Sequence, residues 1–107
     1  MASYRTRTRT YSGTAAAATP TAITEINPLR IWAAIECDLT TAVPMLVTIS
    51  DRADASAAVS FQLQPGERVV FSQAASDMPW TGTIFVEGVG GGAVYRGGEV
   101  YLERIGD

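Results

Sequence analysis

Apolar and polar side chains alternate along most of this chain, in short segments of the kind that form β-strands. These segments cover residues 29–37, 45–51, 57–63, 68–72 and 81–87. Turn-forming residues separate them at intervals of roughly 8–12 residues, which is typical of a β-sandwich. In no stretch do the apolar residues recur at helical spacing over three turns. The pattern therefore predicts an all-β protein, a small antiparallel β-sandwich whose strand order is left open between a jelly roll and a Greek key.

One set of alternating positions in each predicted strand is apolar and is expected to share a face. The sets are Leu29, Ile31, Ala33, Ile35 and Cys37; Met45, Val47 and Ile49; Ala57, Val59, Phe61 and Leu63; Val69 and Phe71; and Ile84 and Val86. Trp32 lies on the other face of its strand and belongs to the core only if the second sheet covers that face.

Turn signals define the connections. Pro65 and Gly66 occupy the central positions of the segment Gln64-Pro65-Gly66-Glu67, which predicts a β-turn. The glycines in 88–92 predict a flexible hairpin connection. The pair Gly97-Gly98 predicts a type I′ turn between strands over 93–96 and 99–105, which would form a terminal hairpin.

The N-terminal segment differs from the rest. In an extended strand, Arg5, Arg7, Arg9 and Tyr11 share one face, while Tyr4 and three threonines share the other. Neither face is apolar enough for a core strand, so this segment suits pairing with an exposed sheet edge, its own or a neighbour's. Residues 12–22 are interpreted as a linker. The predicted organisation is an extended N-terminal arm and linker over 1–24 and a β-sandwich domain over 25–107.

Charge is distributed unevenly between these two parts. Residues 1–24 carry three Arg and no acid, whereas 25–107 carry the other five Arg and all 11 acids. A basic arm on an acidic body suits reaching to a neighbouring copy, and an acidic surface of another protein is the rival reading. The predicted partner-binding residues are Tyr4, Arg5, Arg7, Arg9 and Tyr11. Three arginines among tyrosines can also bind single-stranded nucleic acid, but the acidic body disfavours that reading.

Composition argues against catalysis. The chain has no His and one Cys, which removes the usual general base and excludes an internal disulfide or a cysteine zinc site. Cys37 is expected to be a small buried core residue. No catalytic, cofactor or metal site is predicted, no membrane span or secretion signal is visible, and synthesis in the cytoplasm is expected. Trp32 and Trp80 are candidate sugar platforms, and Trp80, in a loop after Pro79, is a candidate exposed contact.

The order of several short motifs resembles that of small all-β structural proteins of tailed bacteriophages. The motifs are the corner and strand Asn27-Pro28-Leu29-Arg30-Ile31-Trp32, the strand Leu46-Val47-Thr48-Ile49, the turn Leu63-Gln64-Pro65-Gly66-Glu67, the strand start Trp80-Thr81-Gly82 and the last strand Glu99-Val100-Tyr101-Leu102-Glu103. The resemblance covers about residues 27–103 and leaves the arginine-rich arm outside.

This resemblance implies a virion protein without enzymatic activity. It points to a capsid decoration (cement) protein on the capsid surface, with the major capsid protein or other virion proteins as partners, and with copies arranged as a homotrimer or multiplied by the capsid symmetry. The alternatives are a head-fibre base, a tail or head–tail adaptor component, or a module that attaches to host glycans.

Overall fold

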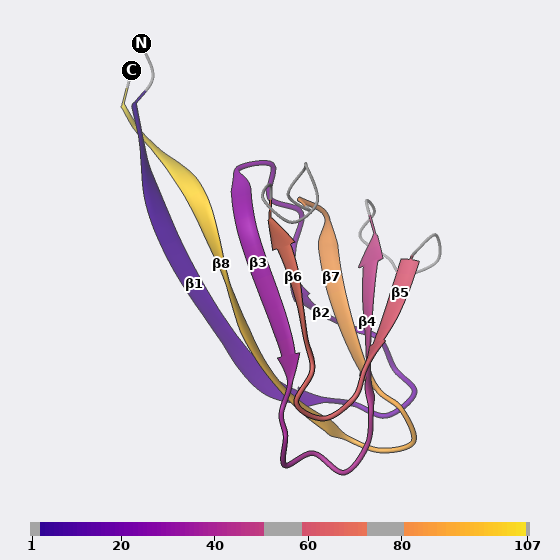
Figure 1. The fold of residues 1–107 in the computed structure, drawn as a ribbon. Helices are drawn as coiled ribbons and strands as arrows, with labels where there is room; N and C mark the ends of the chain where they lie inside the picture. The colour runs from indigo at the N-terminus through magenta and orange to yellow at the C-terminus, as the bar shows by residue number, and fades with distance from the viewer. Residues whose placement is uncertain (1–2, 51–58, 73–80, 107) are drawn as a thin grey trace.

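Within the residues that the structure describes, eight β-strands form two four-stranded antiparallel sheets that pack face to face (Figure 1). The computed structural model describes residues 3–50, 59–72 and 81–106. The strands are β1 (Ser3–Ala15), β2 (Thr21–Thr24), β3 (Arg30–Cys37), β4 (Met45–Ser50), β5 (Val59–Leu63), β6 (Arg68–Ser72), β7 (Thr83–Gly88) and β8 (Ala93–Gly106). The predicted all-β sandwich is confirmed.

The strand order selects one of the two topologies that the sequence left open. The first sheet has the order β1-β8-β3-β6 and the second has the order β2-β7-β4-β5. Every connection except that from β4 to β5 crosses from one sheet to the other, so pairing partners come from distant parts of the chain. This arrangement of eight strands in two sheets is a jelly roll.

The core lies between the sheets and is built from the alternating apolar positions. Its fully or nearly fully buried residues are Ala15, Ala33, Ile35, Cys37, Met45, Val47, Leu63, Phe71, Ile84, Val86 and Ala93. Ile49 and Val69 are partly buried and pack against it, as the alternation predicts. Ala57 and the side chain of Val59 lie outside the part that the structure describes.

Two predicted core positions at the start of β3 are wrong. Leu29 and Ile31 are 39% and 38% exposed, and Arg30 between them is 1% exposed. The pairing register of β3 with β8 shifts between Arg30 and Trp32, which reverses the sides expected from simple alternation. At the edge strand β5, Phe61 contacts the ring of Phe71 at 6.2 Å between centroids yet stays 38% exposed.

The turn at Gln64–Glu67 is confirmed, because the Glu67 amide donates to the Gln64 carbonyl at 2.9 Å and Gly66 has a φ of 91°. The other two turn predictions are wrong. The glycines of 88–92 connect β7 to β8 across the two sheets rather than within a hairpin. Gly97 and Gly98 lie inside the continuous strand β8.

Close packing, not a turn, accounts for glycine at position 97. A Cβ atom there would collide with the carbonyl oxygen of Ala34 and lie 2.9 Å from the Tyr11 ring. Tyr11 is the cross-strand neighbour of Gly97, and its ring occupies the space that a side chain at 97 would need. Glycine here lets two strands and an aromatic ring approach closely.

The segment expected to be an arm and linker contributes a strand to each sheet. β1 pairs with β8 from Ser3↔Gly106 to Ala15↔Ala93, and β2 pairs with β7. Each sheet of the sandwich therefore includes a strand from residues 1–24. Polar side chains on both faces suit β1 because it is an edge strand. One side of its backbone has no strand partner in the described chain.

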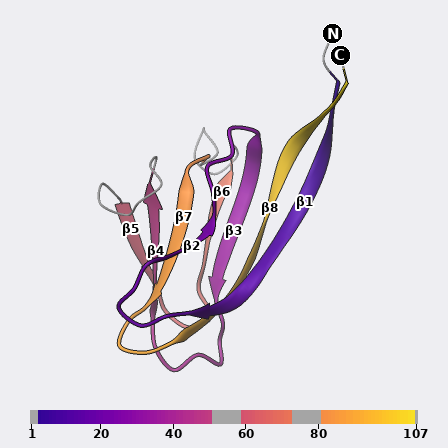
Figure 2. The same ribbon diagram turned by 180° about the vertical axis from the view of Figure 1, so that it is seen from behind.

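The antiparallel pair of β1 and β8, which we call the ribbon, extends beyond the start of β3. Both ends of the chain lie at its tip (Figures 1 and 2). The Leu102 amide of β8 donates to the Leu29 carbonyl at 2.9 Å, next to the start of β3. We call the part beyond it, residues 3–5 with 103–106, the ribbon tip. It contributes to the elongated shape of the molecule, whose principal extents are 50 × 27 × 23 Å.

Candidate functional site

The four face-sharing residues of the N-terminal segment are brought together on one side of β1. In the antiparallel register, Arg5, Arg7 and Arg9 lie opposite Glu103, Tyr101 and Glu99 of β8. Directly paired side chains lie on the same side of a sheet. The ribbon thus presents three arginines on the face that continues the inner face of the first sheet.

These arginines make contacts within the chain. The Nε and Nη2 atoms of Arg5 donate to Oε1 of Glu103 at 2.9 and 2.6 Å, and Nη1 of Arg7 lies 3.6 Å from the same oxygen. The guanidinium of Arg9 lies 5.4 Å from the ring centroid of Tyr101, a cation–π contact. The hydrogen bond from Arg5 and the charge of Arg7 lower the pKa of Glu103. Two arginines share one carboxylate, so this ribbon keeps positive charge in excess.

The two tyrosines of the predicted set have different environments. Tyr4 is 48% exposed near the ribbon tip, where a partner can reach it. Tyr11 packs against the hydrophobic core, and its hydroxyl donates to the carbonyl of Gly98 at 3.1 Å. Burial, followed by the charge of Glu99, raises the pKa of Tyr11 to about 12. The structure thus gives Tyr11 a contact inside the sandwich.

A buried ion pair that sequence reasoning missed lies where the ribbon joins the body. Arg30 and Glu99 have fully buried side chains, and Nε of Arg30 lies 3.3 Å from Oε2 of Glu99. Arg30 also donates to the carbonyls of Gly82 and Glu25 at 2.8 and 2.6 Å. The Thr24 hydroxyl accepts from Arg30 at 2.9 Å and donates to Glu99 at 2.7 Å. This network ties β2, β3 and β8 to the chain before β7.

The network joins motifs that are far apart in the sequence. The Asn27 side-chain oxygen accepts from the Leu29 amide at 3.0 Å, and its carbonyl accepts from the Arg30 amide at 3.0 Å. This corner turns Arg30 toward Glu99 of the last strand and Gly82 of the Trp-Thr-Gly segment. Two of the other motifs noted in the sequence, the Trp-Thr-Gly segment and the last strand, thus each supply a partner to the buried guanidinium of Arg30.

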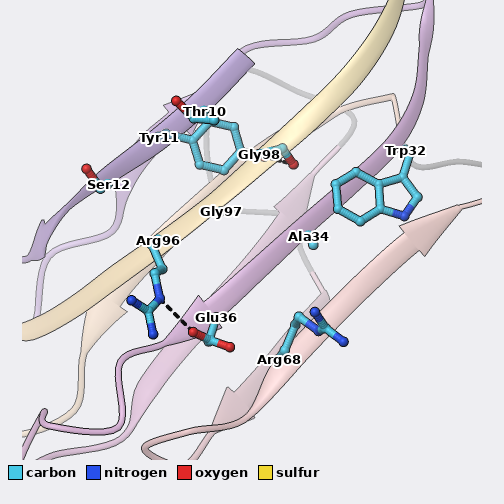
Figure 3. Close-up of a pocket in the computed structure, with 10 residues that line it drawn as sticks. All are labelled: Thr10, Tyr11, Ser12, Trp32, Ala34, Glu36, Arg68, Arg96, Gly97 and Gly98. Atoms are coloured by element: carbon cyan, nitrogen blue, oxygen red, sulfur yellow. Dashed lines mark hydrogen bonds and ion pairs between the residues drawn. The ribbon is translucent and has the colours of Figure 1, made fainter. Parts of the chain in front are cut away.

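The outer face of the first sheet has a hollow (Figure 3). It follows the middle one of three cross-strand rows of side chains and lies between the other two. The middle row is small, with Gly98 beside Ala34. One flanking row contains Arg96, Glu36 and Arg68, and the other contains Trp32. The hollow has a volume of about 530 Å³. We call this feature the outer trough.

Charges at the polar side of the outer trough are only partly paired. Nε of Arg96 donates to Oε2 of Glu36 at 2.7 Å, and Nη1 lies 3.8 Å from Asp38. The hydrogen bond from Arg96 to Glu36 and the two carboxylate charges raise the pKa of Arg96. No carboxylate of the described residues lies within ion-pairing distance of Arg68. One guanidinium beside the outer trough is therefore available.

Two further residues were singled out in the sequence, Trp80 and Cys37. Trp80 lies outside the described residues. Cys37 is fully buried, as expected, and its thiol donates to the Val43 carbonyl at 3.9 Å. Burial, with the charges of Asp38 and Glu36, raises the pKa of the Cys37 thiol. Across residues 3–50, 59–72 and 81–106, no three metal-binding side chains cluster, and no helix is long and apolar enough to span a membrane.

The eight strands of the described residues define the chain as a jelly-roll protein, and the comparison with solved structures agrees with that fold. No family of known proteins and no curated protein matches the sequence. A solved structure from Bacillus endospore appendages, described as a novel family of disulfide-linked pili, has the same fold. The TM-score is 0.65, with 16% sequence identity over 98% of this chain and 91% of that chain. At this identity the similarity establishes the fold.

Proposed function

We propose that this chain is a non-enzymatic structural protein of a repetitive particle, and specifically a decoration protein that binds the major capsid protein of a phage through the ribbon. One observation carries the proposal: β1 is a 13-residue edge strand whose outer backbone groups have no strand partner within the described chain. A long exposed edge is a template for strand addition by another chain. The jelly-roll likeness to a pilus subunit supports a role in repeated assembly.

Charge determines which strand suits this edge. If β1 paired antiparallel with β1 of a second copy and Arg7 faced its own equivalent, Arg5 would face Arg9 on both sides of that pair. Like charges directly opposite each other destabilise a strand pair. The edge therefore favours a strand that offers neutral or acidic side chains at alternate positions, which supports a partner of different sequence such as the capsid protein.

Assembly of this kind is non-covalent. The pili with the similar fold are disulfide-linked, whereas Cys37 is the only cysteine here and is fully buried in the core. A thiol with a raised pKa and no exposure is a poor partner for disulfide exchange. Main-chain hydrogen bonds along β1 and charge contacts from its arginines then supply the attachment.

The second candidate is an adaptor at the head–tail junction or in the tail. The same free edge serves that role, and the two differ in copy number. Decoration of a shell gives hundreds of copies per particle, whereas an adaptor gives about a dozen or fewer, by symmetry. A cryo-EM map of the particle that counts this chain distinguishes them.

Truncation of the ribbon tip tests the anchoring role. A variant without residues 2–5 and 103–107 keeps the Leu102 contact and the Arg30–Glu99 network, so it should remain folded. Its affinity for capsids that lack the protein should fall at least about tenfold. Glu87→Gln, a one-charge change in β7 of the other sheet, is the control and should bind like the wild type. Wild-type affinity of the truncated variant would overturn an anchoring role for the ribbon tip, and no binding by the wild type would overturn the capsid partner.

A further inference from the structure

The outer trough forms because the middle one of three neighbouring cross-strand rows has small residues at its centre. Gly98 pairs with Thr10 on one side and Ala34 on the other, and Ala34 pairs with Val70. These four residues form the low middle row. The flanking rows stand four residues apart along the strands, which is about 13 Å at ~3.3 Å per residue. A hollow of this width has room for a single ring-shaped ligand unit.

One wall is aromatic. Trp32 is 36% exposed, and Figure 3 shows its indole at the end of the hollow opposite Arg96 and Glu36. An exposed indole offers a flat apolar face beside a polar N–H group. The C–H face of a pyranose ring is flat and apolar in the same way, while its hydroxyls need hydrogen-bond partners at the rim. The row at the other wall and the hydroxyl of Thr10 supply such partners.

The other wall carries charged side chains. Arg96 is paired there with Glu36 and lies 3.8 Å from Asp38. Arg68 has no ion-pair partner among the described residues. Its guanidinium suits a carboxylate, which arginine binds through two parallel hydrogen bonds. Charge complementarity therefore favours an anionic ligand over a neutral one.

We propose that the outer trough binds an acidic saccharide, with Trp32 packing against a pyranose ring and Arg68 binding its carboxylate. The site lies on the outer face of the sheet and requires no neighbouring copy, so it is independent of the anchoring role of β1. A volume of about 530 Å³ is within the range of small-ligand sites. The proposal gives the protein a contact with anionic glycans in addition to its structural role.

Titration calorimetry on the isolated chain tests the proposal with three probes: 3′-sialyllactose, trigalacturonate and neutral lactose. At least one acidic probe should bind saturably, with a Kd of about 1 mM or tighter, and lactose at least about tenfold more weakly. Trp32→Ala and Arg68→Ala should each lower the affinity about tenfold or more. Arg68→Lys should recover part of the loss, because it keeps the charge and loses the paired hydrogen bonds.

Three controls keep the result unambiguous. Leu39→Ala removes an apolar side chain that is 73% exposed and away from the outer trough, and should bind like the wild type. Trp80→Ala should also keep binding; loss there with retention in Trp32→Ala would place the site elsewhere and overturn the proposal. Absence of saturable binding by both acidic probes, or equal binding of polyglutamate that is insensitive to Trp32→Ala, would overturn it as well. None of these outcomes depends on capsid binding, so the two proposals can fail separately.

Discussion

Arg30 and Glu99 form an ion pair with no exposed side-chain surface, 3.3 Å apart, at the point where the ribbon joins a sandwich whose core cluster is apolar. A buried pair of this kind costs desolvation, which its hydrogen bonds offset. Here the bonds come from Thr24, Gly82 and the Glu25 carbonyl, so each part of the network holds a different strand or connection in register.

Removing one partner should therefore be costly. Glu99→Gln leaves the Arg30 guanidinium buried without its counter-charge, and the free energy of unfolding in urea should fall by about 3–5 kcal/mol. Replacing both partners by apolar residues, as in Arg30→Met with Glu99→Leu, should recover much of the loss. Glu87→Gln should change it by less than about 0.5 kcal/mol. A small effect of Glu99→Gln would show that the pair is not a main tie of the fold.

Gly97→Ala should destabilise the sandwich without any change in charge. The added Cβ would collide with the Ala34 carbonyl and crowd the Tyr11 ring, at a cost of about 1–3 kcal/mol in urea unfolding. Gly106→Ala is the matched control, because nothing lies within 4 Å of a Cβ at that position. The cost should persist in a Tyr11→Ala background, since the carbonyl is the nearer obstacle. Full rescue by Tyr11→Ala would contradict this account.

Tyr11 should make the protein sensitive to alkali. Its folded pKa of about 12 exceeds the ordinary value of 10.0, so the folded state holds the proton more tightly than the unfolded chain. The associated stability is fully present below pH 10 and is lost as the pH rises toward 12. Urea unfolding at pH 9 and pH 11 should show a larger decrease in the wild type than in Tyr11→Phe. In an ultraviolet titration, Tyr11→Phe should remove a component that ionises near pH 12.

Glu103 should make the ribbon tip sensitive to acid. Its pKa in the folded state lies below the ordinary value of 4.5, so its contribution is present above that pH and is lost as the pH falls through the folded pKa. Hydrogen exchange at the amides of 104–106, corrected for the intrinsic effect of pH, should become faster at pH 3 than at pH 6 relative to the amides of β4. Glu103→Gln should remove the difference, and an unchanged difference in that variant would assign it to another group.

The period of apolar positions was sufficient to predict the strands and most of the core. Ala33, Ile35 and Cys37 are buried as the alternation of β3 predicts, and the turn at Gly66 follows from local residue preferences. These features depend on contacts within a few residues. The burial of Arg30 does not, because it requires a register shift and a carboxylate 69 positions away.

The candidate sites were harder to predict than the strands. The sequence shows that Arg5, Arg7 and Arg9 share a face but contains no signal that the chain's own β8 is their neighbour. The outer trough needs the register of four strands before Gly98, Ala34 and Trp32 form a surface. The pair Gly97-Gly98 has two readings, a turn or a close strand contact, and only the position of Tyr11 distinguishes them.

The pairing of Ser3 with Gly106 at the end of the ribbon has a practical consequence. A polypeptide joined to either end of the chain emerges at the same point, away from the core and the outer trough. A short linker between the two ends would close the chain into a ring or permit new termini at the turn around Gly90. A second protein fused to either end of the chain would be held at a distance from the sandwich. This makes the chain suitable as a scaffold for displaying fused proteins.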